Sequence, residues 1–284
     1  MVLALASLFR ILNNLHPFSD KKLPKISVII PTFQRPKSLA KCIGSIKLGT
    51  FQDFEIIKVR SEGELAELRN RGFKRSIGEI VVFIDDDVVC SKGWLQSIVQ
   101  IFDFSSNIAG VSGPSIITKR FRQNRDIFRH AWLKRLYDFF FLGKKANLPG
   151  HFTESGAWTT GACEELCSYE GEVEFLEACN MAFRRSVFQE VKGFDENYKG
   201  IGDWSEPDIC FRIRKLGYRL WLTRDAVVHH QPAISGAFKK RRKDSRNRME
   251  NYLIFSKRWI KPHWKHELYK LFMRIYYGLK TLKR

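Results

Sequence analysis

The chain has 284 residues, 44% of them hydrophobic, and its net charge of +19 comes from 49 Lys and Arg against 30 Asp and Glu. This length allows one large α/β domain or two small ones, and the charge predicts an anionic partner: nucleic acid, anionic lipid or a phosphorylated substrate. Six scattered cysteines argue against a disulfide framework, and no apolar stretch reaches the roughly 18 residues that a membrane-spanning helix needs.

The first segment, residues 1–24, is expected to form an amphipathic helix that lies on a membrane surface or packs on the domain. Leu5, Leu8, Leu12 and Leu15 recur in it at helical spacing. No charged region precedes the apolar part and no clear cleavage site follows it, so a secretory signal is not expected.

Residues 26–112 alternate short apolar runs with amphipathic stretches. Strands are expected at 26–30, 54–59, 80–84 and 108–112, and helices over 36–46, 65–77 and 94–102. The apolar runs are typical of strands that are buried on both faces of a sheet. The alternation of strands and helices predicts an α/β fold with a parallel, doubly wound sheet.

The third apolar run leads directly into three aspartates, Asp85, Asp86 and Asp87. Neighbouring carboxylates repel one another, so they are tolerable where a strand leaves the sheet and a cation lies among them. Asp85 and Asp87 point to the same side of an extended chain and can reach one ion or one ligand. Their oxygen atoms suit Mg2+ or Mn2+. The alternative is an acidic turn that only caps the strand.

The periodicity weakens over residues 114–160, which contain a basic run (119–135) and an aromatic patch (139–141). An insertion that meets a membrane or an acceptor is one expectation. The other expectation is that the basic residues form a solvent-exposed face and the aromatic residues belong to the core.

The later part of the chain predicts further α/β elements. A strand is expected to lead to Asn180, followed by a short helix through Val191. Ser205 and Asp208 match a capping box at the start of a helix that ends at Gly217. Two further strands are expected at 218–223 and 226–230.

The tail from Lys239 is strongly basic, and its last helix is expected to be amphipathic. The apolar side of that helix is predicted to consist of Leu268, Leu271, Phe272, Ile275, Leu279 and Leu282. A basic amphipathic helix of this kind is typical of binding to an anionic membrane surface.

Taken together, these stretches resemble the inverting glycosyltransferases of the GT-A fold, family 2 type. The matching segments are ISVIIPTFQRP (26–36), LAELRNRGFKRSIGEIVVFIDDDV (65–88), CNMAFRRSVFQEVKGFDE (179–196), SEPDICFRIRKLGYRLW (205–221) and AVVHH (226–230). The resemblance implies a Rossmann-like, mostly parallel sheet flanked by helices, with helical extensions at both termini. It divides the chain into a nucleotide-sugar-binding half (25–113), the insertion (114–160), an acceptor-binding half (161–232) and a basic helical extension (233–284).

The resemblance also implies an activity: transfer of a sugar, with inversion, from a UDP- or GDP-sugar to a polysaccharide or lipid-linked glycan, dependent on Mn2+ or Mg2+. The residues implied to bind the nucleotide sugar are Pro31, Thr32, Arg35, Arg69, Asp85 and Asp86. The implied metal ligands are Asp87 and His230, with His229 as the alternative to His230, and the implied acceptor contacts are Asn180 and Trp204.

Inversion by direct displacement needs one general base for the acceptor hydroxyl. The family's position for that base falls on Glu206, with Asp208 as its rival. One departure concerns the nucleotide base: the strand at 54–59 lacks the family's aspartate at its end, where Glu62 or Glu64 would have to substitute.

The expected location is the cytoplasmic, inner face of a membrane, and nucleic acid is not expected as a partner. Three alternatives stay open at this point. They are a nucleic-acid-binding protein, a non-catalytic membrane-surface protein on a degenerate GT-A fold, and a nucleotidyltransferase.

Overall fold

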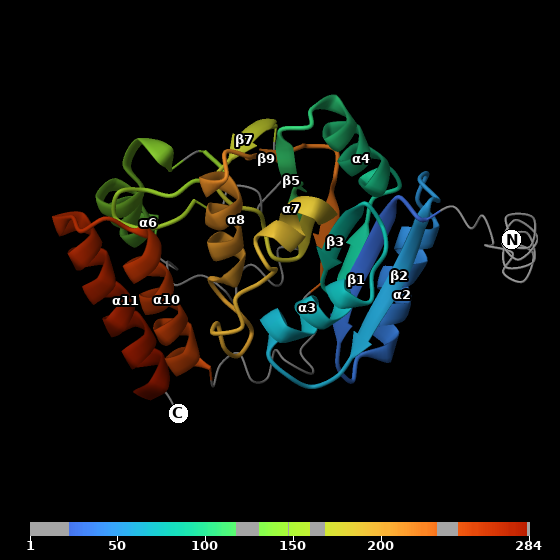
Figure 1. The fold of residues 1–284 in the computed structure, drawn as a ribbon. Helices are drawn as coiled ribbons and strands as arrows, with labels where there is room; N and C mark the ends of the chain where they lie inside the picture. The colour runs from blue at the N-terminus through green and yellow to red at the C-terminus, as the bar shows by residue number, and fades with distance from the viewer. Residues whose placement is uncertain (1–22, 118–130, 147, 160–167, 232–243, 283–284) are drawn as a thin grey trace, which may run out of the picture.

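The computed structural model describes residues 23–117, 131–146, 148–159, 168–231 and 244–282 (Figure 1). Its centre is a seven-stranded sheet in the order β2-β1-β3-β8-β5-β9-β7. The strands are β1 (Ile26–Thr32), β2 (Phe54–Arg60), β3 (Ile80–Ile84), β5 (Ile108–Ser112), β7 (Gly171–Val173), β8 (Asn180–Arg184) and β9 (Arg219–Leu222). Only β8 and β7 run against their neighbours among these strands, so the prediction of a mostly parallel α/β sheet is confirmed.

The sheet separates two hydrophobic cores, and β3 contributes to both. All of its residues are buried, and their side chains alternate between the two faces of the sheet. Val81 and Phe83 belong to the first core, together with Ile29 of β1, whereas Val82 and Ile84 belong to the second. The apolar run was therefore correctly interpreted as a strand that is covered on both sides.

Helices cover each face of the sheet. Helices α2 (Pro36–Lys47) and α4 (Trp94–Phe104) bury their apolar sides in the second core, and α3 (Leu65–Lys74), α7 (Arg185–Glu190) and α8 (Ser205–Lys215) in the first. Helix α3 lies very close to β1 at Gly72, where a Cβ atom would stand 2.3 Å from Cγ2 of Ile29. Only glycine fits this contact, which holds the polar side of α3 near the edge of the sheet.

A second, three-stranded sheet has the order β4-β10-β6 and consists of β4 (Val88–Cys90), β10 (Val228–His230) and β6 (Ser115–Ile117). Strand β10 pairs with β4 in antiparallel register, which places His230 opposite Val88. This pairing brings the end of β10 directly beside Asp87, although His230 is 143 positions away in the sequence.

The C-terminal part forms two helices, α10 (Ser245–Trp259) and α11 (Trp264–Leu282), which lie side by side at one end of the molecule, next to α8 (Figure 1). Beside α11 lie α6 (Ala131–Tyr137) and a π-helical turn η1 (Asp138–Leu142), which a 3-10 turn η2 (Gly143–Lys145) follows. Tyr252 and Phe255 of α10 and Tyr269, Met273 and Tyr277 of α11 are buried in the first core. The C-terminal helices are thus part of the folded core, and α10 was not predicted.

Two local predictions were wrong. The strand expected to lead to Asn180 ends at Val173 as β7, residues 174–179 form no strand, and Asn180 is itself the first residue of β8. The capping box does not form either: α8 begins at Ser205, its N-cap is Trp204, and no side chain caps it. The predicted apolar side of α11 does not face the core: the buried apolar residues of the helix are Tyr269, Met273 and Tyr277, whereas Leu268, Leu271 and Ile275 are exposed.

Some predictions fall on residues outside the described part of the chain, namely the N-terminal helix with Leu5, Leu8, Leu12 and Leu15 and the basic run at 239–243. Among the helices that the structure does describe, none combines the length and the apolar character needed to cross a bilayer.

Candidate active site

The three consecutive aspartates lie at the carboxyl end of β3, where the loop after β1 meets them. Thr32 Oγ1 donates a hydrogen bond of 2.6 Å to Asp86. Arg35 Nη1 donates to Asp86 at 2.9 Å and to Asp87 at 3.1 Å. The two loops meet because β1 and β3 are parallel neighbours, so their carboxyl ends share one edge of the sheet. Asp86 and Asp87 are buried, and burial raises the pKa of Asp86 even though Thr32 and Arg35 oppose the shift.

Asp85, Asp87 and His230 form a possible metal-binding group. One ligand atom from each lies within 4.8 Å of the others, and His230 Nε2 is 3.0 Å from Asp87 Oδ1. Burial lowers the pKa of His230, but Asp87 and the neighbouring Cys179 outweigh it and raise the pKa to about 10. A cation would replace this imidazole proton, because a metal ligand must be deprotonated. Two carboxylates and an imidazole suit Mn2+, so these residues fit the predicted cation.

A small cavity of about 90 Å³ lies beside Asp87. Lys37 and Lys41 of α2 contribute to its lining, together with Gln231. Two ammonium groups at this point add positive charge next to the aspartates, on the side where an anionic ligand group would be stabilised. These lysines were not among the predicted site residues.

Arg69 of α3 connects the aspartates with the predicted general base. Its Nη1 donates to Glu206 Oε1 at 2.6 Å, and its Nη2 donates to the Ala178 carbonyl at 3.2 Å and lies 4.0 Å from Asp85 Oδ1. The Arg69 side chain is 1% exposed, so it is not a solvated helix arginine. Burial raises the pKa of Glu206, and Arg69 opposes that shift. Glu206 is thus a buried carboxylate next to the proposed metal group.

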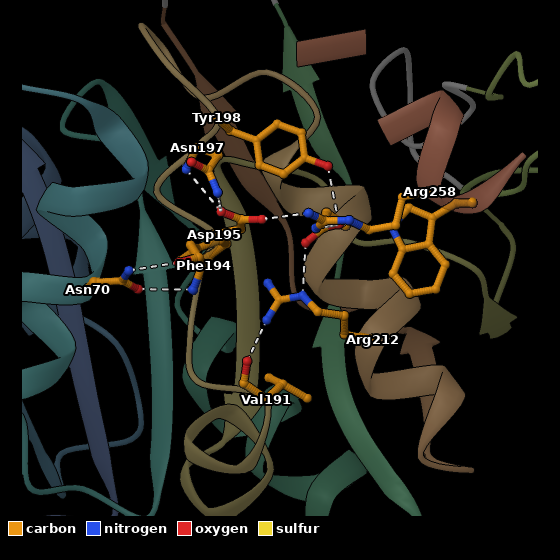
Figure 2. Close-up of polar contacts among 10 residues, drawn as sticks. Asn70, Val191, Phe194, Asp195, Asn197, Tyr198, Arg212 and Arg258 are labelled. Carbon is orange, nitrogen blue, oxygen red and sulfur yellow. Dashed lines mark hydrogen bonds and ion pairs between the residues drawn. The ribbon is translucent and has the colours of Figure 1, made fainter. Parts of the chain in front are cut away.

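Asp208, the rival base, has a different environment. Its carboxylate is fully buried and accepts hydrogen bonds from Tyr198 Oη (3.1 Å), Arg212 Nε (2.8 Å), Arg258 Nη1 (2.7 Å) and Trp259 Nε1 (2.8 Å). Figure 2 shows Tyr198, Arg212 and Arg258 converging on this point, and Arg258 also donates to Asp195 at 2.9 Å.

We call these six residues the Asp208 network: Asp195, Tyr198, Asp208, Arg212, Arg258 and Trp259. Because both oxygen atoms of Asp208 already accept hydrogen bonds inside the protein, this environment argues against a role as the base. The network instead attaches α8 to α10.

The two predicted acceptor contacts are also buried. Asn180 Oδ1 accepts from Trp94 Nε1 at 2.8 Å, and its Nδ2 donates to the carbonyls of Gly113 and Ala226 at 3.0 and 2.8 Å. This side chain joins β8 to α4 and to the segments that lead into β6 and β10, and its polar atoms are already bonded. This bonding argues against contact between Asn180 and an acceptor.

Trp204 is 1% exposed, and its ring packs against Trp158 and Tyr252 at centroid distances of 4.2 and 4.9 Å. This burial argues against direct contact with an acceptor. The residue has a left-handed backbone, with a φ of 79°, which is unfavourable for a bulky side chain and persists where the surroundings fix it. Trp204 thus fixes the start of α8, two residues before Glu206.

The structure also gives the surroundings of the remaining predicted residues. Pro31 is half-buried within β1, and the nucleotide contacts of Pro31, Thr32, Arg35 and Arg69 stay predictions. Glu64, suggested as a substitute for the missing aspartate, accepts a hydrogen bond from the Gly200 backbone N–H. His229 is exposed, whereas His230 faces Asp87, so the structure favours His230 as the ligand.

Comparison with known proteins finds similarity to glycosyltransferases. The model of glycosyl transferase family 2 matches residues 58–192. The chain is 23% identical over 242 residues to a glucosyl-dolichyl phosphate glucuronosyltransferase of Haloferax volcanii, covering 73% of this chain and 69% of that protein. It is 29% identical over 125 residues to a GalNAc(5)-diNAcBac-PP-undecaprenol beta-1,3-glucosyltransferase of Campylobacter jejuni, covering 34% of this chain and 40% of that protein.

Among solved structures, a mannosyltransferase of Pyrobaculum calidifontis in complex with GDP-Man and Mn2+ has a similar fold. The TM-score is 0.53 at 17% identity, over 97% of this chain and 77% of that chain. At this identity the likeness concerns the fold alone. Sequence and fold together confirm the resemblance: the chain has the GT-A fold, and its residues 58–192 match glycosyl transferase family 2.

Proposed function

We propose that the protein transfers one sugar from a nucleotide-sugar donor to a polysaccharide or lipid-linked glycan, with inversion and with a divalent cation. The observation that carries this proposal is the position of Arg69. Its guanidinium lies against Glu206 on one side and 4.0 Å from Asp85 on the other. The buried Arg69 guanidinium therefore lies between the candidate base and one carboxylate of the candidate metal group.

Asp85, Asp87 and His230 would hold the cation, which when bound stabilises the negative charge of the departing diphosphate. Lys37 and Lys41 line the cavity beside Asp87 and would contact the same anionic group. Thr32 and Arg35 fix the loop after β1 by binding Asp86, and so orient the donor. His230 is proposed to give up its proton when the cation binds.

Glu206 would take the proton of the acceptor hydroxyl. As the acceptor oxygen bonds to the anomeric carbon, the bond from that carbon to the diphosphate oxygen breaks, and the nucleoside diphosphate leaves with the electron pair. Burial raises the pKa of Glu206, which makes its ionised form a stronger base than an exposed glutamate. Arg69 positions this carboxylate.

The acceptor class is supported by the relatives, whose names include a dolichyl phosphate and an undecaprenol diphosphate carrier. We propose a lipid-linked acceptor and, with it, an anionic membrane surface on the inner side as the place of action. The net charge of +19 supports this part of the proposal.

The test is a panel of UDP- and GDP-sugars read by release of the nucleoside diphosphate, with Mn2+, with Mg2+ and with a chelator. Release that requires a cation and is lost in Glu206→Gln, but not in the exposed control Glu190→Gln, supports the proposal. Pyrophosphate formed from a nucleoside triphosphate would replace it with nucleotidyl transfer. Salt-dependent binding to RNA or DNA without any sugar turnover would replace it with nucleic-acid binding.

A further inference from the structure

The end of the molecule formed by α6, η1 and α11 exposes large apolar side chains in two stripes. On α11 they are Trp264, Leu268, Leu271 and Ile275, with exposed fractions between 40% and 62%. On α6 and η1 they are Trp132, Leu136, Phe139 and Phe140, with exposed fractions between 46% and 76%. We call these eight residues the apolar stripes. Their spacing of three or four positions puts each set on one face of its helix.

The exposed stripe of α11 is separate from its core-facing side. Tyr269, Met273 and Tyr277, which are buried, lie about half a helical turn away from Leu268, Leu271 and Ile275. Helix α11 thus has two opposite apolar faces, and the core uses only one of them. Amphipathic packing on the domain therefore does not account for the second face.

The two stripes belong to neighbouring elements. Tyr137 and Phe141 contact Phe272 at ring centroid distances of 5.6 and 5.5 Å, and Phe141 contacts Tyr269 at 5.2 Å. These aromatic contacts hold α6 and η1 against α11. The stripes consequently lie on neighbouring elements at one end of the molecule.

The charges around the stripes indicate what covers them. Residues 131–145 contain four basic side chains and one acidic one, and residues 264–282 also contain four and one. The acidic side chains, Asp138 and Glu267, are each bonded to a lysine, Lys134 and Lys270. Exposed tryptophan, phenylalanine and leucine within a basic rim fit the boundary between the headgroups and acyl chains of an anionic bilayer.

We propose that the apolar stripes are the surface by which the protein docks on an anionic lipid bilayer. The stripes would insert between the lipid headgroups, and Arg135, Lys144, Lys265 and Arg274 would contact the lipid phosphates. The proposal deepens the proposed function, on which it rests for the class of acceptor, but docking itself needs no catalysis. A lipid-linked acceptor would thereby be met in the plane of the membrane.

The test uses the full chain and sedimentation with vesicles of phosphatidylcholine alone or mixed with phosphatidylglycerol. The double variant Phe139→Ser/Leu271→Ser removes one side chain from each stripe. Its control, Phe104→Ser/Ile77→Ser, removes matched side chains elsewhere: Phe104 is 77% exposed against 76% for Phe139, and Ile77 is 51% exposed against 53% for Leu271. Point substitutions are required, because deleting α11 would also remove its buried side from the core.

We expect the stripe variant to bind mixed vesicles about tenfold more weakly, or worse, while the control binds like the parent. Arg135→Gln/Arg274→Gln should reduce the preference for phosphatidylglycerol, and Lys47→Gln/Lys74→Gln should not. The melting temperature and the release of nucleoside diphosphate without vesicles should not change in any of these variants, which separates this proposal from the proposed function.

Equal vesicle binding by the stripe variant and its control would overturn the proposal, since binding would then come from another part of the chain. A parent that does not bind vesicles, but forms dimers that the stripe variant loses, would also overturn it and assign the stripes to a second copy of the chain.

Discussion

Two groups of acidic and basic side chains, in the same α/β scaffold, differ in how their charges are balanced. In the Asp208 network two aspartates face two arginines, and the hydrogen bonds measure 2.7–3.1 Å. At the sheet edge four carboxylates, Asp85, Asp86, Asp87 and Glu206, face Arg35, Arg69 and His230. Counted over these directly paired groups, the network is neutral, whereas the sheet edge has four carboxylates for three cationic side chains, and Lys37 and Lys41 line the cavity beside Asp87. The network thus has its full set of partners within the chain, and we propose that the sheet edge is the group that binds a cation.

The largest expected effect tests the sheet edge. We expect Asp87→Ala to lower cation-dependent turnover by a factor on the order of a thousand or more, because it removes a ligand of the charge-stabilising ion. Titration calorimetry with Mn2+ should show the loss of binding, and circular dichroism should show a folded protein. The exposed Asp103→Ala serves as the control. Unchanged turnover in Asp87→Ala would remove the metal site from this edge.

The next effect concerns the base. Glu206→Gln keeps the shape of the side chain and its contact with Arg69 but removes its basicity, so turnover should fall roughly a hundredfold or more. Donor affinity, measured by titration with the nucleoside diphosphate, should hardly change. If Asp208→Asn abolished turnover while Glu206→Gln did not, the base would lie two residues later and the comparison would be reversed.

Asp208→Asn should act on stability. The substitution leaves Arg212 and Arg258 without their shared anionic partner, and we expect a loss of about 2–4 kcal/mol in the free energy of unfolding, reduced from the fully buried case because Arg258 is partly exposed. Denaturant titration provides the measurement, with Glu190→Gln as the control. Full stability together with lost turnover would show that Asp208 is not a structural residue.

The smallest effect is a shift with pH. Because burial raises the pKa of Glu206, turnover should increase with pH through a midpoint above the ordinary value of 4.5. Its contribution to stability has the opposite sign: it is present below the unfolded pKa and decreases as pH rises through the folded one. Asp203 also raises this pKa and Arg69 lowers it, so Arg69→Gln should move the midpoint upward. A midpoint at or below 4.5, in a profile of kcat/KM against pH, would contradict this reading of Glu206.

Much of the fold could be predicted from the sequence. The strands at 26–30, 54–59, 80–84 and 108–112 became β1, β2, β3 and β5, because apolar runs bounded by turn residues identify buried strands. Helix α10 was missed because its pattern is weak: many of its residues are polar, and it is held by contacts with distant parts of the chain. Strand β10 lies within the strand predicted at 226–230, but its partners β4 and β6 were missed because each has only 3 residues.

The site residues show where such prediction stops. Asp208 and Glu206 have the same chemistry and lie two positions apart, so the sequence leaves both as candidates. Their partners distinguish them: Asp208 binds Arg258, 50 positions away, and Glu206 binds Arg69, 137 positions away. Asn180 and Trp204 were assigned to the acceptor only because the resemblance implied it. Their side chains instead point into the interior, a direction that only packing decides.

The attachment of α8 to α10 has a consequence for the order in which the protein is made. A ribosome releases the donor-side strands and the glutamate of α8 well before Arg258 and Trp259 of α10. Until then Asp208 lacks two of its four donors, and Trp204 lacks the α10 side chains Tyr252 and Phe255, which lie 4.9 and 5.1 Å from its ring. The helix that carries the proposed base is therefore fixed late in synthesis, and an incomplete chain would bear the sheet-edge aspartates without a correctly held Glu206.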